Sequence, residues 1–464
     1  MSSRHSSNTN RFAWLTLPVI LATTVLMTLN TAIVNVALGA VRDSLGFSPA
    51  SISWVINGYL LTYGGFLIVG GRLGDLVGRR RTMLIGIAVF TIASVSAAIA
   101  WTPSLLVASR ALQGIGAALS APAVLAIITH LYEGESRTKA IGWFSVVVGV
   151  ALSMGMILGG VILHWWGWRG IFWVNVPFGV LLFGMTAWFV PPMSPERRSR
   201  IDGIGAVLIT SVTIAIVYAL VALAASVTSH RTPLAGLISM GFAVLGFLAL
   251  AMHLRSTTEP LIPLASFSQP TVVGAFSASA LQAAALSSMI FFMSQWFGSQ
   301  LGLHPVEIGA MFLLFTVPQL GTAIAARRLN RRFGVRRMVI ACLFLAATGM
   351  LLLADAVTVQ RITPQLVIGM FLAGAGCGAV YLGLNITIMS VISADIAGVA
   401  SGVLQTTVQL GASIGIALLV LVSVLAGISG ALFGGALLLL AGVMALAIGR
   451  QFSKTRSRTA SATR

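Results

Sequence analysis

The sequence predicts an all-α integral membrane protein with fourteen transmembrane helices, and three observations lead to this fold class. Hydrophobic residues make up 57% of the 464 residues and charged residues only 8%, against about 25% charged residues in a soluble domain. The apolar residues fall in runs of roughly 20, the length of helix that spans a bilayer. The basic residues cluster in short segments between these runs.

The apolar runs follow one another along the whole chain. We count fourteen, which begin near Phe12, Trp54, Met83, Ser104, Ala140, Gly170, Gly203, Leu234, Val272, Glu307, Met338, Gln365, Gly398 and Ser429. The first run is too long for the core of a signal peptide and is followed by further runs, so we expect it to remain in the protein.

Two polar stretches divide the runs into groups of six, two and six. The stretch "PPMSPERRSRID" ends the sixth run, and "STTEPLIPLASFSQP" follows the eighth. This pattern predicts two six-helix bundles and a two-helix insert between them. The expected divisions are an N-terminal tail at 1–11, a first bundle at 12–190, a linker at 191–202, the insert at 203–255, a loop at 256–271, a second bundle at 272–450 and a basic tail at 451–464.

The basic residues fall mostly on one side of the membrane. If the tail at 1–11 is cytoplasmic, most of the 28 lysines and arginines lie in cytoplasmic segments, chiefly at 72–81, 197–200, 327–337 and 450–464. This asymmetry follows the positive-inside rule and predicts that both termini are cytoplasmic. The net charge of +18 is therefore explained by topology, and we expect no nucleic-acid partner.

Two loops carry an internal repeat. "GGRLGDLVGRRRTML" follows the second run and "RRLNRRFGVRRMVI" follows the tenth, and both contain Leu-x-x-x-x-Gly-x-Arg-Arg when Gly78 is aligned with Gly334. Repeated halves are a known way to build a transporter around a site at the membrane midplane. The repeat therefore favours two related bundles.

Polar residues in the first run gather on one side of the expected helix. Thr31 and Asn35 share a stripe with Thr24 and Thr28, and Asn30 widens it into an arc of about 160° at 3.6 residues per turn. Such an arc faces a bundle interior or a water-filled cavity. The alternative is that these residues only join neighbouring helices by hydrogen bonds.

The fourth run contains Arg110, a charge inside the membrane, at a depth similar to that of Asn30. A buried guanidinium needs hydrogen-bond acceptors. The side-chain oxygens of Asn30 and Gln113 are the candidates. The alternative is that Arg110 extends along its helix to the membrane surface.

Several stretches resemble one transporter family in the same order. "LVASRALQGIGAA" resembles motif B of the major facilitator superfamily and "GRLGDLVGRRR" resembles its motif A. "LNTAIVNVAL" and "WRGIFWVNVPFG" are similar to the 14-span drug:proton antiporters of the EmrB/QacA type. The resemblance covers nearly the whole chain. It implies a major facilitator fold in the bacterial inner membrane, with export of small amphipathic compounds by alternating access.

Motif A is expected to act as a conformational latch through Gly71, Asp75, Gly78, Arg79 and Arg80. The Asp75 carboxylate can accept hydrogen bonds at a neighbouring helix start, where an anion is favoured. Arg79 and Arg80 can bind acidic or carbonyl groups. The resemblance implies that this latch closes the cytoplasmic side in the outward-open state. The alternative is an ordinary loop whose arginines set the topology.

The fifth run contains "ALSMGMILGG", which resembles the antiporter motif C. Gly155, Gly159 and Gly160 let helices approach closely. Met156 stands where the family usually has proline and Ala151 where it usually has glycine, so the helix is expected to bend less. Plain small-residue packing explains this motif equally well.

The position of Asn30 is usually an aspartate in relatives, where it is the candidate for proton coupling. An amide does not titrate, so Asn30 cannot carry a proton. All ten acidic residues lie in expected loops or near the ends of runs. We therefore expect Arg110 to leave the cavity positive and the substrate to be neutral, zwitterionic or anionic. Coupling would use a peripheral acid such as Asp75 or Asp355, or the charge of the substrate, or be absent.

The second half offers weaker candidates for the same cavity. Tyr381 and Asn385 share one helix face, and Gln405 and Gln409 in the next run are similarly spaced. Aromatic residues could line an apolar pocket, since ligand cavities are mostly hydrophobic with a few polar contacts; the candidates are Phe291, Phe292 and Trp296.

A secondary exporter is the leading interpretation, and two alternatives remain. One is a uniporter or importer of a neutral or anionic solute, and the other is a membrane sensor or scaffold without transport. An enzyme is disfavoured because no nucleophile–base pair or metal-ligand cluster is evident. We expect no cofactor and no metal. The expected partners are a small-molecule substrate, the lipid bilayer and, for an antiporter, protons, and the protein is expected to be a monomer.

Overall fold

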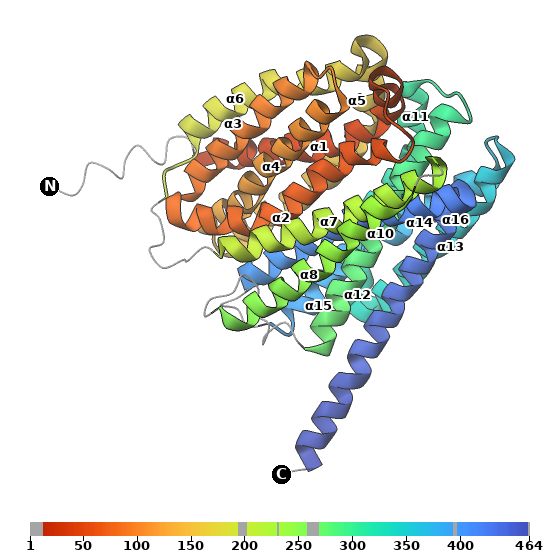
Figure 1. Ribbon diagram of the computed structural model, residues 1–464. Coiled ribbons are helices and arrows are strands. Elements are labelled where there is room, and N and C mark those ends of the chain that lie inside the picture. The colour runs from red at the N-terminus through yellow and green to blue at the C-terminus, as the bar shows by residue number, and fades with distance from the viewer. Residues whose placement is uncertain (1–12, 194–201, 230–231, 258–268, 393–396, 463–464) are drawn as a thin grey trace.

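The computed structural model confirms the predicted all-helical chain (Figure 1). It describes residues 13–193, 202–229, 232–257, 269–392 and 397–462, and no β-strand occurs in these ranges. Eleven helices there are long and apolar enough to cross a membrane, and one bent pair makes a twelfth span. The expected tail at 1–11, most of the linker at 191–202 and most of the loop at 256–271 lie outside the described residues.

Two breaks raise the number of spans to the predicted fourteen. Non-helical backbone interrupts α5 (Gly134–Trp173) at Gly167 and α16 (Ala397–Ala462) at Ala426 and Gly427. At about 1.5 Å per residue, neither α16 nor α5 with its continuation α6 (Asn175–Phe189) could fit a bilayer core of about 30 Å as a single span. These segments therefore give two spans each, and each of the other ten helical segments gives one span. The sixth begins at Trp168, slightly before the expected Gly170.

The first bundle contains six spans before the insert. Besides α5 and α6, its helices are α1 (Ala13–Leu45), α2 (Trp54–Val77), α3 (Arg79–Ala98) and α4 (Pro103–Leu131). Glycines let these helices approach closely: a Cβ added to Gly70 of α2 would lie 2.1 Å from the carbonyl oxygen of Ala118 in α4. In lipid the hydrophobic effect does not drive helices together, so close packing at small residues is what favours their association.

The second bundle contains six spans built from seven helices. They are α10 (Pro270–Ser299), α11 (Pro305–Met311) continued by α12 (Leu313–Phe333), α13 (Val335–Ala356), α14 (Pro364–Gly378) continued by α15 (Val380–Met389), and the two parts of α16. The end of α16 extends away from both bundles (Figure 1).

The two bundles repeat the same turns, in agreement with the predicted internal repeat. In each bundle, glycines with positive φ stand at three turns: after the first span, between the second and third spans, and between the fifth and sixth spans. The pairs are Gly46 with Gly302, Gly78 with Gly334, and Gly167 with Gly427. Only glycine adopts such φ values readily, so the repeated glycines reflect the same backbone path in both halves.

The fourth span of each bundle begins with the same cap. Thr102 precedes Pro103 and Thr363 precedes Pro364, and each threonine hydroxyl accepts a hydrogen bond from a backbone N–H three residues on. Threonine at the N-cap followed by proline is a favoured helix start.

The bundles meet along several pairs of helices, chiefly α2 with α16, α5 with α11 and α1 with α10. Helix α2 runs beside α16, where the Ser413 hydroxyl donates to Asn57 Oδ1 at 3.1 Å. The other two pairs meet at the end opposite the Gly78 loop. The Ser294 hydroxyl of α10 donates to the carbonyl oxygen of Asn35 in α1, and Gly160 of α5 packs on α11.

The insert lies over the seam between the bundles. Its helices are α7 (Gly203–Ser229), which packs on both α2 and α16, and α8 (Leu234–Ser256), which lies outside it (Figure 1). A Cβ added to Gly65 of α2 would lie 2.0 Å from the Thr210 hydroxyl of α7, so the contact is close. Only 11% of the most apolar window of α8 is buried, which leaves most of this helix to lipid.

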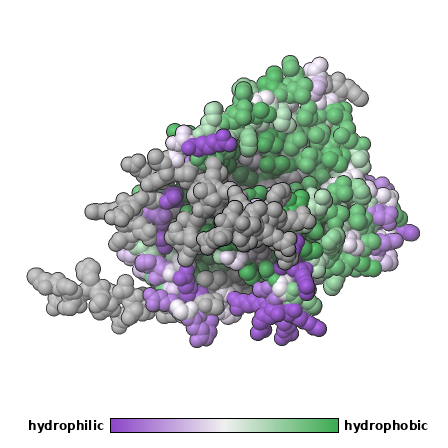
Figure 2. All heavy atoms as spheres, turned by 90° about the horizontal axis from the view of Figure 1, so that it is seen from below, coloured by the Kyte–Doolittle hydropathy of each residue, from purple (hydrophilic) through white to green (hydrophobic). Residues whose placement is uncertain are grey.

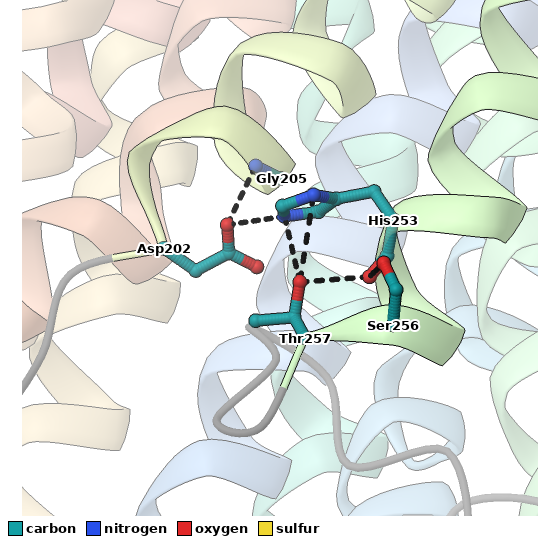
Figure 3. A network of polar contacts seen from close by, with 5 residues as sticks. All are labelled: Asp202, Gly205, His253, Ser256 and Thr257. Atoms are coloured by element: carbon teal, nitrogen blue, oxygen red, sulfur yellow. Dashed lines mark hydrogen bonds and ion pairs between the residues drawn. The ribbon is translucent and has the colours of Figure 1, made fainter.

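A polar cluster closes the insert at the ends of its two helices (Figure 3). Asp202 precedes α7, and its Oδ1 accepts from the backbone N–H of Gly205 at 2.8 Å. The same oxygen lies 2.7 Å from His253 Nε2 near the end of α8. Thr257 donates to the carbonyl oxygen of His253 at 2.8 Å. The Asp202 carboxylate therefore caps α7 and also links it to α8.

The surface matches a protein surrounded by lipid. Hydrophobic side chains cover broad areas in Figure 2, and hydrophilic ones gather along one part of the view. Exposed tryptophans lie near both ends of the spans: Trp101, Trp165 and Trp166 near the Gly46 end, and Trp143 and Trp188 near the Gly78 end. Tryptophan is enriched at both membrane–water interfaces.

Candidate substrate and coupling site

Arg110 lies inside the first bundle and only 1% of it is exposed. Its Nη1 donates to Asn30 Oδ1 and to Gln113 Oε1, each at 2.7 Å. Its Nε donates to the carbonyl oxygen of Val55 at 2.9 Å. The predicted acceptors are thus confirmed. The alternative in which Arg110 extends to the membrane surface does not hold.

Neutral groups surround the guanidinium on its remaining sides. The ring of Tyr59 lies over it, with 4.6 Å from the Arg110 Cζ to the ring centroid. Gln113 Nε2 donates to the Ser94 hydroxyl at 2.7 Å, and Ser94 donates to the carbonyl oxygen of Phe90. Within the described ranges Arg110 forms no ion pair. The charge is therefore retained in the bundle without a carboxylate among the described residues. Arg110 was predicted to face a cavity, but it is packed among α1, α2, α3 and α4 and presents almost no open surface.

Asn30 supplies one of its two polar groups to this cluster. Its Oδ1 accepts from Arg110, whereas its Nδ2 is buried and has no hydrogen-bond partner among the described residues. A buried unpaired donor costs about 1–3 kcal/mol. The surroundings of position 30 thus favour a side chain that only accepts hydrogen bonds, which is the property of a carboxylate.

Thr31 and Asn35 lie on the same helix and reach the boundary between the bundles. The Thr31 hydroxyl donates to the carbonyl oxygen of Met27, and Asn35 Nδ2 donates to the carbonyl oxygen of Thr31 at 2.9 Å. The Asn35 backbone in turn accepts from Ser294 of the second bundle. Asn35 therefore lies at the interface, and its role toward a substrate stays a prediction.

Tyrosines and glutamines form a second polar group between the bundles. The Tyr381 hydroxyl of α15 donates to Gln405 Oε1 of α16 at 3.1 Å. Tyr63 of α2 is placed to interact with the side chains of Gln405 and Gln409. Asn385 is half-buried, one helical turn after Tyr381. Within this group, Tyr381 is exposed and Tyr63 is partly buried.

Tyr59 and Tyr63 lie between the two polar groups and were not predicted from the sequence. Their ring centroids lie 5.6 Å apart. Their spacing of four residues on one helix was the available signal, because such residues share a face. By contrast, Phe291, Phe292 and Trp296 do not line a pocket in this structure, because all three are buried in the hydrophobic core.

The motif A loop holds two other helices of its own bundle. Arg79 Nη1 donates to the carbonyl oxygen of Ala126 in α4 at 3.1 Å, and Arg80 Nη2 donates to that of Ala187 in α6. Carbonyl partners for these arginines are as predicted. Asp75 Oδ1 lies 3.5 Å from Arg79 Nη2, and a Cβ on Gly71 would contact Pro122 of α4.

The motif C glycines face two different helices. Added Cβ atoms at Gly155 and Gly159 would meet α1, at 2.6 Å from the Ala32 Cβ and 3.1 Å from the Ile33 Cα. One at Gly160 would lie 2.3 Å from the carbonyl oxygen of Pro305 in α11. The first two glycines therefore pack α5 within its bundle, and the third packs it against the other bundle.

The described acidic residues lie at helix ends, as expected. Those in the described ranges are Asp43, Asp75, Glu133, Glu135, Asp202, Glu307 and Asp355. No cluster of His, Cys, Asp or Glu that could hold a metal ion occurs in the part of the chain that was described. Cys342 and Cys377 are buried free thiols.

Comparisons with known proteins agree with this architecture. Residues 20–259 and 275–463 match the Major Facilitator Superfamily. A puromycin resistance protein of Streptomyces alboniger is 33% identical over 415 residues, which are 88% of this chain and 82% of that protein. A cephamycin export protein of Amycolatopsis lactamdurans is 34% identical over 436 residues, covering 90% of this chain and 87% of the relative.

Solved structures share the fold. A human organic anion transporter aligns with a TM-score of 0.65 at 17% identity, over 94% of this chain and 99% of that one. A D-xylose–proton symporter aligns with a TM-score of 0.67 at 14% identity, over 94% and 97% of the two chains. The family match covers most of the residues, and the helices form two repeated bundles, so the chain belongs to the major facilitator superfamily.

Proposed function

We propose that this chain exports small amphipathic, drug-like compounds across the bacterial cytoplasmic membrane by alternating access, as a proton-coupled antiporter. Members of its family are transporters, so an enzymatic role is set aside. Export is supported by the relatives named for puromycin resistance and cephamycin export. The basic end, which carries the Gly78 and Gly334 loops, faces the cytoplasm in this proposal, as do both termini, and the working unit is a monomer.

The single observation that carries the choice of substrate is the neutral surrounding of Arg110. Asn30 and Gln113 hold its guanidinium through side-chain oxygens, and neither bears a charge. An uncompensated positive charge beside the transport path raises the energy of a cation there. The substrate is therefore a neutral, zwitterionic or anionic compound with an apolar body.

The proposed site combines both polar groups. The substrate and coupling cavity is formed by residues of both groups, some lining it and others holding the lining residues in place. They are Asn30, Thr31, Asn35, Arg110, Gln113, Tyr381 and Asn385. In the alternating cycle, motif A acts as the latch at the basic end. Gly155, Gly159 and Gly160 allow α5 to pack closely at the other end.

Proton coupling in this proposal uses a carboxylate at a helix end, because the Asn30 amide does not titrate. Asp75 is the preferred candidate, since it lies 3.5 Å from Arg79 within the latch. Protonation would weaken this ion pair and release the loop. Asp355, near the end of α13, is the second candidate.

A uniporter of a neutral or anionic solute is the competing function. The same observation favours it, because within the described residues no carboxylate faces Arg110. A uniporter would move its solute down a concentration gradient and would ignore an imposed pH gradient.

The test is efflux from a pump-deficient bacterial host, measured for a panel of aromatic compounds with and without a protonophore. The proposal expects lower accumulation when the chain is expressed and loss of that effect with the protonophore. Efflux that persists unchanged with the protonophore would favour the uniporter. Asn30→Asp, run in parallel, is expected to make efflux more dependent on the proton gradient.

A further inference from the structure

A series of neighbouring side chains leads from the buried Arg110 to the second bundle. The guanidinium lies 4.6 Å from the Tyr59 ring centroid, and the Tyr59 and Tyr63 rings lie 5.6 Å apart. Tyr63 is placed to interact with the amides of Gln405 and Gln409. The series thus crosses from α2 to α16 through aromatic rings and uncharged amides.

The series ends at an exposed side chain. Tyr381 donates to Gln405 Oε1 at 3.1 Å and is nevertheless 41% exposed. Its hydroxyl lies where α15 meets α16, and α2 approaches the same glutamine from the other bundle. Tyr381 therefore keeps part of its side chain uncovered at the place where its hydroxyl reaches Gln405.

From this arrangement we propose that Tyr63, Tyr381, Gln405 and Gln409 form a binding subsite for an uncharged hydroxyl or amide group on an aromatic substrate. This inference rests on the proposed transport function and deepens it. We call these four residues the tyrosine–glutamine subsite.

The chemistry of the four side chains selects this ligand class. A phenol and a primary amide each donate and accept hydrogen bonds, so together they match a group that does both. None is charged, and a charged ligand group would lose its hydration here without an opposite charge in return. The ring of Tyr63 adds an apolar face, against which an aromatic ligand can pack.

The subsite also links binding to the movement of the bundles. Tyr63 belongs to the first bundle, and both glutamines belong to the second. Their contact must break when α2 and α16 separate at this level. A ligand hydroxyl or amide can interact with the polar groups that the separation leaves without a neighbour, so binding lowers the cost of separation only for ligands with such a group.

The inference is tested by ligand binding to the purified protein at pH 7. The probes are chloramphenicol and paracetamol, which are uncharged aromatic compounds with hydroxyl and amide groups, and tetraphenylphosphonium, an aromatic cation with neither. We expect the wild type to bind both uncharged probes more tightly than the cation. Tyr381→Phe and Gln405→Leu should each weaken that binding by about ten-fold, the effect of one lost hydrogen bond in a desolvated site.

The matched control is Tyr218→Phe, which removes a phenol hydroxyl from the insert helix α7 and should leave the affinities unchanged. Tyr381→Phe deletes one oxygen from an exposed residue, so it keeps the test valid if Gln405→Leu fails to fold. The subsite is wrong if the cation binds more tightly than both uncharged probes, or if both variants bind like the wild type. If the protein exports the compounds but both variants bind the probes like the wild type, the subsite alone is wrong. Binding through the subsite without export would overturn the proposed function alone.

Discussion

The Asn30 side chain meets Arg110 with its oxygen and leaves its nitrogen unpaired. Oδ1 lies 2.7 Å from Arg110 Nη1, while Nδ2 is buried and forms no hydrogen bond with a described residue. The guanidinium therefore receives the acceptor it needs, and the amide carries a donor that its surroundings do not use. This geometry fits a carboxylate at least as well as it fits the amide.

Replacing Asn30 by aspartate should consequently stabilise the protein. The variant removes a buried unpaired donor and adds an ion pair to Arg110, and we expect the free energy of unfolding to rise by about 1–3 kcal/mol. Thermal unfolding in detergent at neutral pH measures this. Asn57→Asp is the matched control, because Asn57 is equally buried, its Nδ2 also has no partner among the described residues, and its Oδ1 accepts from the neutral Ser413 hydroxyl. It removes the same kind of unpaired donor but adds a buried carboxylate without a facing arginine. This control should destabilise. If Asn30→Asp lowers the unfolding temperature, position 30 does not favour a side chain that only accepts hydrogen bonds.

Gly160→Ala should open the end of the protein at which α5 packs on α11. An added Cβ would lie 2.3 Å from the carbonyl oxygen of Pro305, so the two bundles must separate there. A cysteine at Ser294, which is 4% exposed at the same end, should then react faster with a membrane-impermeant maleimide. The background lacks Cys342 and Cys377.

Gly142→Ala is the control for this experiment. Gly142 lies on the same helix, and an added Cβ would find no atom within 4 Å. Its labelling should equal that of the parent protein. Equal labelling of Gly160→Ala and the parent would show that this glycine does not hold the bundles together.

Arg80→Ala should lower the stability of the first bundle. The guanidinium donates to the carbonyl oxygen of Ala187 in α6, and losing a hydrogen bond from a charged donor costs about 1.5–3 kcal/mol. Arg81→Ala, next in the chain and exposed, removes the same charge and should change the unfolding temperature much less. If the two variants unfold at the same temperature, the contact with α6 contributes nothing beyond charge.

Asp202→Ala should loosen the insert. The change removes both the cap on α7 and the contact with His253 (Figure 3), and we expect a loss of about 1–3 kcal/mol. Asp43→Ala is the comparison, because its pair with Arg42 is exposed and such pairs contribute about 0–1 kcal/mol. Thermal unfolding that is the same for the two variants would exclude a structural role for the Asp202–His253 contact.

The sequence predicted the features that depend on local composition. Apolar runs located the spans because a helix needs about 20 apolar residues to cross the lipid. Gly78 and Gly334 indicated the repeat because the backbone at both positions requires glycine. The Arg110 contacts followed from depth along two helices and from the need of a buried charge for acceptors. These rules act without knowledge of which helices are neighbours.

Features that depend on neighbouring helices were not predictable in the same way. Phe291 and Phe292 could have faced a pocket or the core, and only the packing of α10 decides for the core. Helix α2 packs on α16 beside Tyr63, where a Cβ added to Gly64 would lie 2.9 Å from the Gln409 Cβ, and this approach joins residues far apart in the sequence. The burial of Arg110 behind Tyr59 likewise depends on how α2 lies against α4.

An intramembrane arginine held by neutral groups should bias transport against cations. The direct measurement compares the cellular accumulation of matched uncharged, anionic and quaternary ammonium aromatic compounds in a pump-deficient host, with and without expression of this chain. We expect expression to lower the accumulation of the uncharged and anionic compounds several-fold more than that of the quaternary ammonium compounds. If the quaternary ammonium compounds are exported best, the claim is wrong.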